Sequence, residues 1–343
     1  MKDVKTNSTP SKKVVKTVII VSVSVILALA IAIPLFTLGG IWGILDHARY
    51  VIYPEYYSIK TDICTNPGLS DGFVCQGIAA YEAKFGGDRF LVSGYMKDGE
   101  ASRIYVTDLK DNSYFVKVIL PDGEEFKGHA GGIAVSDGTV YLASNHSLFV
   151  ISLEDILGAS KGDTVKVQRV IPVNVASSFV FADEEYLFVG EFHDGKDYIT
   201  DNYYKTPDGD ENHAIVSIYT YESLNAYEDG GEDPLPVGIY SIRNKVQGFC
   251  VTDDERVVMS TSYGLADSFY YVYDMNGAEC FEYTEDGVPV FYFAGECREI
   301  KGPAMAEGLD IYDGSVITLS ECASDKYIFG KFFFANKIVA LDF

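Results

Sequence analysis

The sequence predicts an all-β chain built from repeated units, and two observations carry this prediction. From Gln76 to the C-terminus, short apolar strands alternate with Asp-Gly, Gly-Gly and Asn turns, and helical periodicity appears only briefly, near residues 153–157. The second observation is a hairpin, clearest at residues 307–321, in which two short strands flank the tight turn Asp313-Gly314. Versions of this hairpin recur along the chain, and such a recurrence is a strong guide to architecture.

Five versions of the hairpin occur, and each of the first four is followed by two further predicted strands. Four strands per repeat is the composition of one blade of a β-propeller, in which sheets are arranged around a central axis. A sixth blade would have to fit within residues 46–75, which is too short a segment, so we predict five four-stranded blades. The hairpins begin near Gln76, Gly131, Ser177, Gln247 and Glu307.

The outer strands of the blades follow from the same pattern. We expect them at residues 103–108 and 114–120, 148–153 and 165–173, 214–221 and 238–243, and 269–274 and 289–294, with 336–342 alone in the fifth repeat. Because the fifth repeat lacks its outermost strand, we predict that a strand near residues 50–59 completes it. This N-terminal strand would close the ring and remove exposed sheet edges.

A small residue occupies one equivalent position in every inner strand. Five strands that converge on one axis leave little volume at the centre, so glycine or serine is expected there. The residues at this position are Gly77, Gly132, Ser178, Gly248 and Gly308.

The N-terminal region predicts a membrane anchor. Residues 1–17 carry five lysines and one aspartate, and residues 18–45 carry no charge. About 20 apolar helical residues span a bilayer core, and lysines on the N-terminal side place that end in the cytoplasm. A cleaved signal peptide is the alternative, because Ala28-Leu29-Ala30 resembles a cleavage site, but the apolar run continues through Trp42.

We therefore predict a single-pass protein of the cell membrane with four parts. These are a basic cytoplasmic tail (1–17), a transmembrane signal-anchor (18–45), a juxtamembrane segment with the closing strand (46–75) and an extracytoplasmic propeller (76–343). The formal net charge of −23 becomes −27 once the +4 of the tail is set aside. A body this acidic repels phosphate backbones, so we expect no nucleic-acid partner.

The six cysteines suit an oxidising compartment. Cys64 and Cys75 flank one loop and Cys280 and Cys297 flank one hairpin, so each pair is a candidate disulfide. Cys250 and Cys322 lie in apolar strands, where buried free thiols are an equal alternative. No pair has the CxxC spacing of a zinc or redox site.

A functional site is expected at one face of the ring, which we call the mouth. The first two strands of each blade are antiparallel, so the beginning of the first and the end of the second lie on this face. The 193–212 loop leaves from the same face and is a candidate lid, with a solvated insertion as the alternative. The candidate site residues are His129, Glu191 and Glu321 as catalytic groups, Gln76, Asn145, Ser177, Gln247 and Tyr263 as ligand-binding groups, and Glu307 with Glu191 as metal ligands.

Three functions fit such a mouth. The first is a membrane-tethered ectodomain that binds a small molecule, a wall glycan or a peptide, and we favour it. In the second, Ca²⁺ held by Glu307, Glu191 and amide oxygens polarises a lactone or ester carbonyl, and His129 is the general base. The third is a glycosidase that uses two of the carboxylates. The side chains at the mouth also have structural alternatives, as hydrogen-bond partners of neighbouring blades.

A family resemblance bears on the second function. The segments 307–311 (Glu-Gly-Leu-Asp-Ile) and 131–135 (Gly-Gly-Ile-Ala-Val), each followed by Asp-Gly and an apolar strand, resemble inner hairpins of gluconolactonase/senescence-marker-like and paraoxonase-like propellers. The resemblance implies a calcium-centred channel and hydrolysis of lactones or esters. Those families usually have six blades and ligands rich in asparagine and aspartate. The departures from that ligand set are Gln76, Gly131, Ser177 and Gln247.

Overall fold

The computed structural model describes residues 12–37, 40–82 and 87–343, and these form two separate units, Met1–Ile52 and Tyr53–Phe343. The first unit contains helices α1 (Lys12–Thr37) and α2 (Gly40–Ile52). Within α1, the stretch Val15–Ile33 has a mean hydropathy of 2.6 over its 19 residues, so it is long and apolar enough to span a membrane. Residues 1–11 of the predicted tail lie outside the described part.

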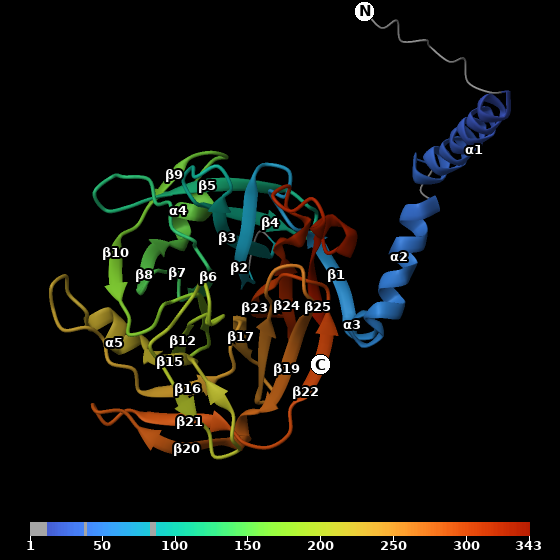
Figure 1. The fold of residues 1–343 in the computed structure, drawn as a ribbon. Coiled ribbons are helices and arrows are strands. Elements are labelled where there is room, and N and C mark those ends of the chain that lie inside the picture. The colour runs from blue at the N-terminus through green and yellow to red at the C-terminus, as the bar shows by residue number, and fades with distance from the viewer. Residues whose placement is uncertain (1–11, 38–39, 83–86) are drawn as a thin grey trace, which may run out of the picture. The chain divides into compact units, whose positions relative to one another are not determined.

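The second unit is a five-bladed β-propeller, as the repeats predict (Figure 1). Blade 1 contains β2 (Phe73–Tyr81), β3 (Arg89–Met96), β4 (Arg103–Asp108) and β5 (Ser113–Ile119), and blade 2 contains β6 (Gly132–Ser136), β7 (Thr139–Ser144), β8 (Ser147–Ser152) and β10 (Arg169–Pro172). Blade 3 contains β11 (Phe179–Ala182), β12 (Tyr186–Gly190), β15 (Ala214–Thr220) and β16 (Gly238–Ile242). Blade 4 contains β17 (Val246–Val251), β18 (Arg256–Thr261), β19 (Ser268–Asp274) and β22 (Arg298–Gly302), and blade 5 contains β23 (Ala306–Tyr312), β24 (Ser315–Ser320), β25 (Lys337–Leu341) and β1 (Lys60–Thr65).

The inner strands meet around one axis. Each of β2, β6, β11, β17 and β23 contacts the inner strands of both neighbouring blades, so the ring is complete. The predicted crowding is present: a Cβ built on Gly132 would lie 2.5 Å from the backbone nitrogen of Val180, and one on Gly248 would lie 2.7 Å from that of Leu309. Both contacted atoms belong to the next inner strand, so the small residue is a requirement of ring closure.

An N-terminal strand closes the ring, but its position differs from the prediction. The segment expected to form it, near residues 50–59, is helical, and Pro54 begins the short helix α3 (Pro54–Ile59) at a position where its missing N–H costs little. The closing strand is β1, which pairs antiparallel with β25 from Lys60↔Leu341 to Thr65↔Lys337. Two tyrosines of the 50–59 segment, Tyr53 and Tyr56, are buried in the core, and Tyr56 stacks on Tyr270.

Two outer-strand predictions are also corrected. The 165–173 segment divides, because β9 (Thr164–Lys166) joins blade 1 parallel to β5 and only β10 joins blade 2. The predicted outer strand of blade 4, at 289–294, is β21 (Pro289–Phe293), which pairs parallel with β16 of blade 3. Together with β20 (Ala278–Tyr283) it extends blade 3 to six strands. Its buried Val290 packs in the same apolar cluster as Ile239, and that packing fixes which sheet it joins.

All six cysteines are free thiols, so neither candidate disulfide is present. Cys64 and Cys75 are both buried in the apolar cluster shared by blades 1 and 5. Burial raises the pKa of the Cys64 thiol to about 12, and that of Cys75 is also well above its ordinary value. These two side chains therefore behave as small apolar core residues.

Candidate functional site

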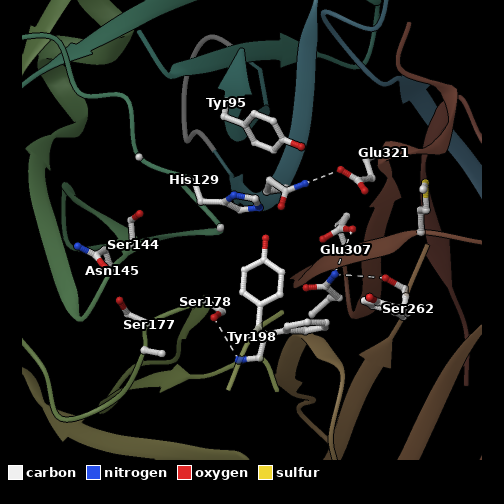
Figure 2. Close-up of a pocket in the computed structure, with 18 of the residues that line it drawn as sticks. Tyr95, His129, Ser144, Asn145, Ser177, Ser178, Tyr198, Ser262, Glu307 and Glu321 are labelled. Atoms are coloured by element: carbon white, nitrogen blue, oxygen red, sulfur yellow. Dashed lines mark hydrogen bonds between the residues drawn. The ribbon is translucent and has the colours of Figure 1, made fainter. Parts of the chain in front are cut away.

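A cavity of about 840 Å³ opens at the predicted mouth, where the inner strands of the five blades begin (Figure 2). Its lining comes from the starts of the first strands, the ends of the second strands and the loops that follow them. The predicted site residues that line it are Gln76, His129, Asn145, Ser177, Gln247, Tyr263, Glu307 and Glu321. The geometry thus brings together side chains that are separated by up to 245 residues along the chain.

Glu191 is the predicted site residue that does not line the cavity. It follows β12 and is 2% exposed. Its carboxylate accepts hydrogen bonds from the Asn202 side chain at 2.7 Å and from the Ala176 backbone at 3.3 Å. Burial raises the pKa of Glu191, and these hydrogen bonds offset part of the rise. In this arrangement Glu191 fastens the 193–212 loop to blade 3, and it does not share a site with Glu307.

Two carboxyl groups dominate one side of the cavity. Burial raises the pKa of Glu321 from 4.5 to about 7, and it raises the pKa of Glu307 well above the ordinary value, with repulsion from Glu321 adding to the rise. Gln76 donates to Glu321 at 2.8 Å, and Gln247 donates to Glu307 at 3.4 Å. Because two nearby buried carboxylates repel each other, this pair retains at least one proton near neutral pH.

His129 faces the carboxyl pair from blade 2. Its ring packs on that of Tyr95 with the centroids 4.7 Å apart. Burial and the nearby Lys326 lower the pKa of His129 to about 4, so the imidazole is neutral at physiological pH. The Lys326 amine donates a hydrogen bond to the Tyr95 hydroxyl. The cavity wall therefore carries a neutral imidazole, a phenol and one amine close together.

The long loop contributes to the site as predicted from its position. Tyr198, Ile199 and Thr200 line the cavity, and Figure 2 shows the ring of Tyr198 directed into its interior. Farther along, the loop forms the small hairpin β13 (Tyr204–Lys205) and β14 (Glu211–Asn212). The Tyr263 hydroxyl donates to Asp197 at 3.3 Å, which ties this loop to blade 4. The loop is thus an ordered wall of the cavity in this structure.

Several residues with a left-handed backbone lie along the same wall. Four lining residues other than glycine have a left-handed backbone, with φ of 49° at Asn145, 59° at His146, 35° at Ser177 and 60° at Met305. Side chains with a Cβ rarely adopt this conformation, and such positions are enriched at functional sites. Asn145 and His146 form the two-residue turn between β7 and β8, which explains their backbone, whereas Ser177 and Met305 lie outside the hairpin turns.

The donor set does not fit the calcium centre that the family resemblance implies. Calcium takes about six to eight oxygen ligands, with several carboxylates among them. No cluster of three or more His, Cys, Asp or Glu side chains suited to a metal occurs in the described ranges. Glu307 and Glu321 are each turned toward a glutamine NH₂ group, and Glu191 lies elsewhere. We therefore derive no chemistry through a metal, and a histidine with pKa about 4 is a weak general base.

Some lining residues were not among the predicted site residues. Lys326 and Tyr327 lie in the irregular segment after Glu321, where no strand register indicates which way a side chain points. The position of this segment could have indicated them, because it follows the second strand of blade 5, which ends at the mouth. Tyr198 and Thr200 could be placed only within the predicted lid. Ser144 and Ser178 also line the cavity.

Comparison with known proteins gives the fold a broad context. No protein-family model and no curated protein matches the chain. Among solved structures, the chain is similar to the PQQ-bound form of aldose sugar dehydrogenase from Streptomyces coelicolor, with a TM-score of 0.39 and 16% identity over 76% of this chain and 77% of that one. It is also similar to a chain of the nidogen/laminin complex, with a TM-score of 0.39 and 9% identity over 73% of each chain. Likenesses of this size carry no functional argument, so the function is argued from the cavity.

Proposed function

We propose that this chain is a membrane-anchored β-propeller, exposed on the extracytoplasmic side, that binds a neutral, hydroxyl-rich ligand such as a sugar unit in its central cavity. The observation that carries the proposal is the composition of the cavity wall. The volume of about 840 Å³ suits a ligand of one or two sugar rings. The orientation is supported by the lysines that precede the apolar stretch of α1.

The polar groups of the wall favour an uncharged ligand. The carboxyl groups that line the cavity are Glu307 and Glu321, and the amine that lines it is Lys326. The pair retains a proton, so these opposing charges nearly cancel. Donors and acceptors without charge are numerous, because amides, hydroxyls and a neutral imidazole come from all five blades. A polyol can satisfy such groups without bringing an uncompensated charge into a partly desolvated space.

Aromatic rings supply the apolar part of the wall. Tyr95, Tyr198, Tyr263 and Tyr327 all line the cavity, and each combines a flat apolar face with a hydroxyl group. A sugar ring has the matching form, with apolar C–H faces and a polar edge. This combination distinguishes the cavity from a purely apolar pocket for lipid tails.

Titration calorimetry with the purified full-length chain tests the proposal. We expect at least one neutral mono- or disaccharide to bind, and sugar acids and sugar phosphates to bind more weakly. Gln247→Ala removes one uncharged donor from the wall and should weaken binding by about 2- to 10-fold. Gln168→Ala, at an exposed position on blade 2, is the matched control and should leave the affinity unchanged. Failure of every neutral sugar to bind, or equal losses in both variants, would contradict the proposal.

The carboxyl pair favours glycoside hydrolysis as a second candidate function. A carboxyl group that keeps its proton near neutral pH can protonate a leaving group, and its partner can act as base or nucleophile. Glu307, whose pKa is raised well above its ordinary value, is the candidate acid, and Glu321, with a pKa of about 7, is the candidate base or nucleophile. Recovery of the sugar intact after the titration supports binding alone, and release of its cleavage products supports hydrolysis.

A further inference from the structure

We propose that the rim of the cavity rests on a lipid–water interface, so that the cavity opens toward a membrane surface. The proposal concerns a patch of side chains outside the cavity, and it stands whether or not the ligand is a sugar. We define the rim patch as Tyr198 and Ile199 of blade 3, Leu265 of blade 4, and Ile328 and Phe329 of blade 5.

The rim patch is more exposed than apolar side chains of this size usually are. Ile328 is 74% exposed, Phe329 is 70% exposed and Ile199 is 72% exposed. Tyr198 and Leu265 are about half exposed, at 53% and 46%. Isolated exposed apolar residues need no explanation, but a group gathered around one opening marks an interaction surface.

These side chains gather at one place because their neighbours line the same cavity. Tyr198 and Ile199 line it directly, Leu265 follows the lining residue Gly264, and Ile328 follows Lys326 and Tyr327. The hydrogen bond between Tyr263 and Asp197 holds the loops of blades 3 and 4 together. The patch therefore forms an arc over three consecutive blades at the mouth, and the opposite face of the ring does not contribute to it.

The composition of the blade 5 segment indicates lipid as the occupant. Exposed Lys326 and Lys331 flank Ile328 and Phe329, and lysines beside aromatic and aliphatic side chains are typical of segments that lie in the headgroup region. The rest of the chain outside the basic tail has a formal charge of −27. An anionic surface would repel that body, including exposed Asp197 and Asp201 beside Tyr198 and Ile199, so the blade 5 segment is the part of the rim patch suited to anionic lipid.

The same chain carries the means to keep this surface near a bilayer. Residues 34–52 separate the apolar stretch ending at Ile33 from the propeller, which begins at Tyr53. Nineteen residues reach about 65 Å when extended and about 30 Å when helical. A tether of this length raises the effective concentration of bilayer at the rim, so a contact of a few side chains is enough. A soluble protein partner lacks this built-in advantage, and a second copy of the chain is distinguished from lipid by the experiment below.

Tryptophan quenching in the full-length chain tests the contact, because Trp42 is the single tryptophan. In a Trp42→Phe background, Phe329→Trp places the reporter in the rim patch. Leu109→Trp is the matched control, since Leu109 is 48% exposed and follows β4 at the end away from the mouth. Each variant is reconstituted in nanodiscs, one chain per disc, with brominated or unlabelled phospholipid acyl chains.

We expect the brominated lipid to reduce the emission of Phe329→Trp about twofold or more and to leave that of Leu109→Trp nearly unchanged. Equal quenching of the two reporters would overturn the proposal. A second result would also overturn it: a blue-shifted emission of Phe329→Trp that is not quenched by brominated lipid and is seen only with two chains per disc. That result would mean that a second copy of the chain covers the rim. Neither result alters the sugar titration, so failure here is distinguishable from failure of the proposed function.

Discussion

Gly132→Val is expected to prevent the propeller from folding. A Cβ at this position would lie 2.5 Å from the Val180 nitrogen and 2.6 Å from the Phe179 Cα, and both atoms belong to the backbone of the neighbouring inner strand. Backbone atoms cannot move aside as a side chain can, so the two blades would have to separate at the axis. We expect a loss of at least about 4 kcal/mol in the free energy of unfolding, comparable with the whole stability of many domains.

Urea unfolding followed by circular dichroism measures this loss, and the yield of soluble protein gives a second readout. Gly158→Ala is the matched control, because Gly158 ends the surface helix α4 (Leu153–Gly158) and a Cβ there meets nothing within 4 Å. The control should unfold at the wild-type urea concentration or slightly above it, since alanine is the better helix former. An unfolding midpoint for Gly132→Val equal to that of wild type would show that the inner strands do not meet at the axis as described.

Glu321→Gln is expected to reduce the pH dependence of stability. The pKa of Glu321 is about 7 in the folded chain and 4.5 when the group is unperturbed, so the folded state holds this proton more tightly. The contribution of Glu321 to stability is therefore complete below pH 4.5 and is lost as the pH rises through 7. The shift corresponds to roughly 2 to 3 kcal/mol after allowance for solvent in the cavity.

Urea unfolding at pH 5 and pH 8 gives the difference in stability for each chain. The wild type should lose roughly 2 to 3 kcal/mol more than Glu321→Gln between these pH values, because glutamine carries no titrating proton. Asp310 and His129 have shifted pKa values too, but both are present in the two chains and cancel in the comparison. Glu307 does not cancel fully, because repulsion from Glu321 is part of what raises its pKa, so the difference between the chains belongs to the carboxyl pair. Glu285→Gln, in an exposed turn, should keep the full wild-type dependence. Identical pH dependence in wild type and Glu321→Gln would mean that Glu321 is solvated and unpaired.

Much of the fold could be predicted from the sequence, because every blade of a propeller places the same steric and pairing requirements on its strands. Each inner strand needs a small residue where the strands converge, and Gly132 and Gly248 meet the backbone of the next blade at that position. Each hairpin is antiparallel, so the residues at strand starts and ends share one face whatever the details of the loops. This rule alone placed Gln76, His129 and Glu307 around a single cavity.

The incorrect predictions concern segments whose hydrophobic period and strand propensity do not show which part of the fold they pack against. The aromatic segment 50–59 has strand propensity, yet Tyr53, just before α3, and Tyr56, within it, are buried in the core from a helical backbone. The strand β21 has the alternation of any outer strand, and only the packing of Val290 shows that it joins blade 3. Glu191 lies one residue beyond the end of β12, where strand alternation no longer fixes the direction of a side chain. Its carboxylate is hydrogen-bonded to Asn202 and does not line the cavity.

The central claim is that ring closure brings polar groups from distant repeats into one cavity, and a double-mutant cycle tests it most directly. Gln76 of blade 1 donates to Glu321 of blade 5 at 2.8 Å across the closing point of the ring. Gln76→Ala, Glu321→Ala and the double variant are unfolded with urea at pH 8, where Glu321 is mostly ionised. We predict a coupling free energy of about 1 to 2 kcal/mol, as expected for a hydrogen bond to a charged group. Additive losses within about 0.3 kcal/mol would show that the two side chains do not meet.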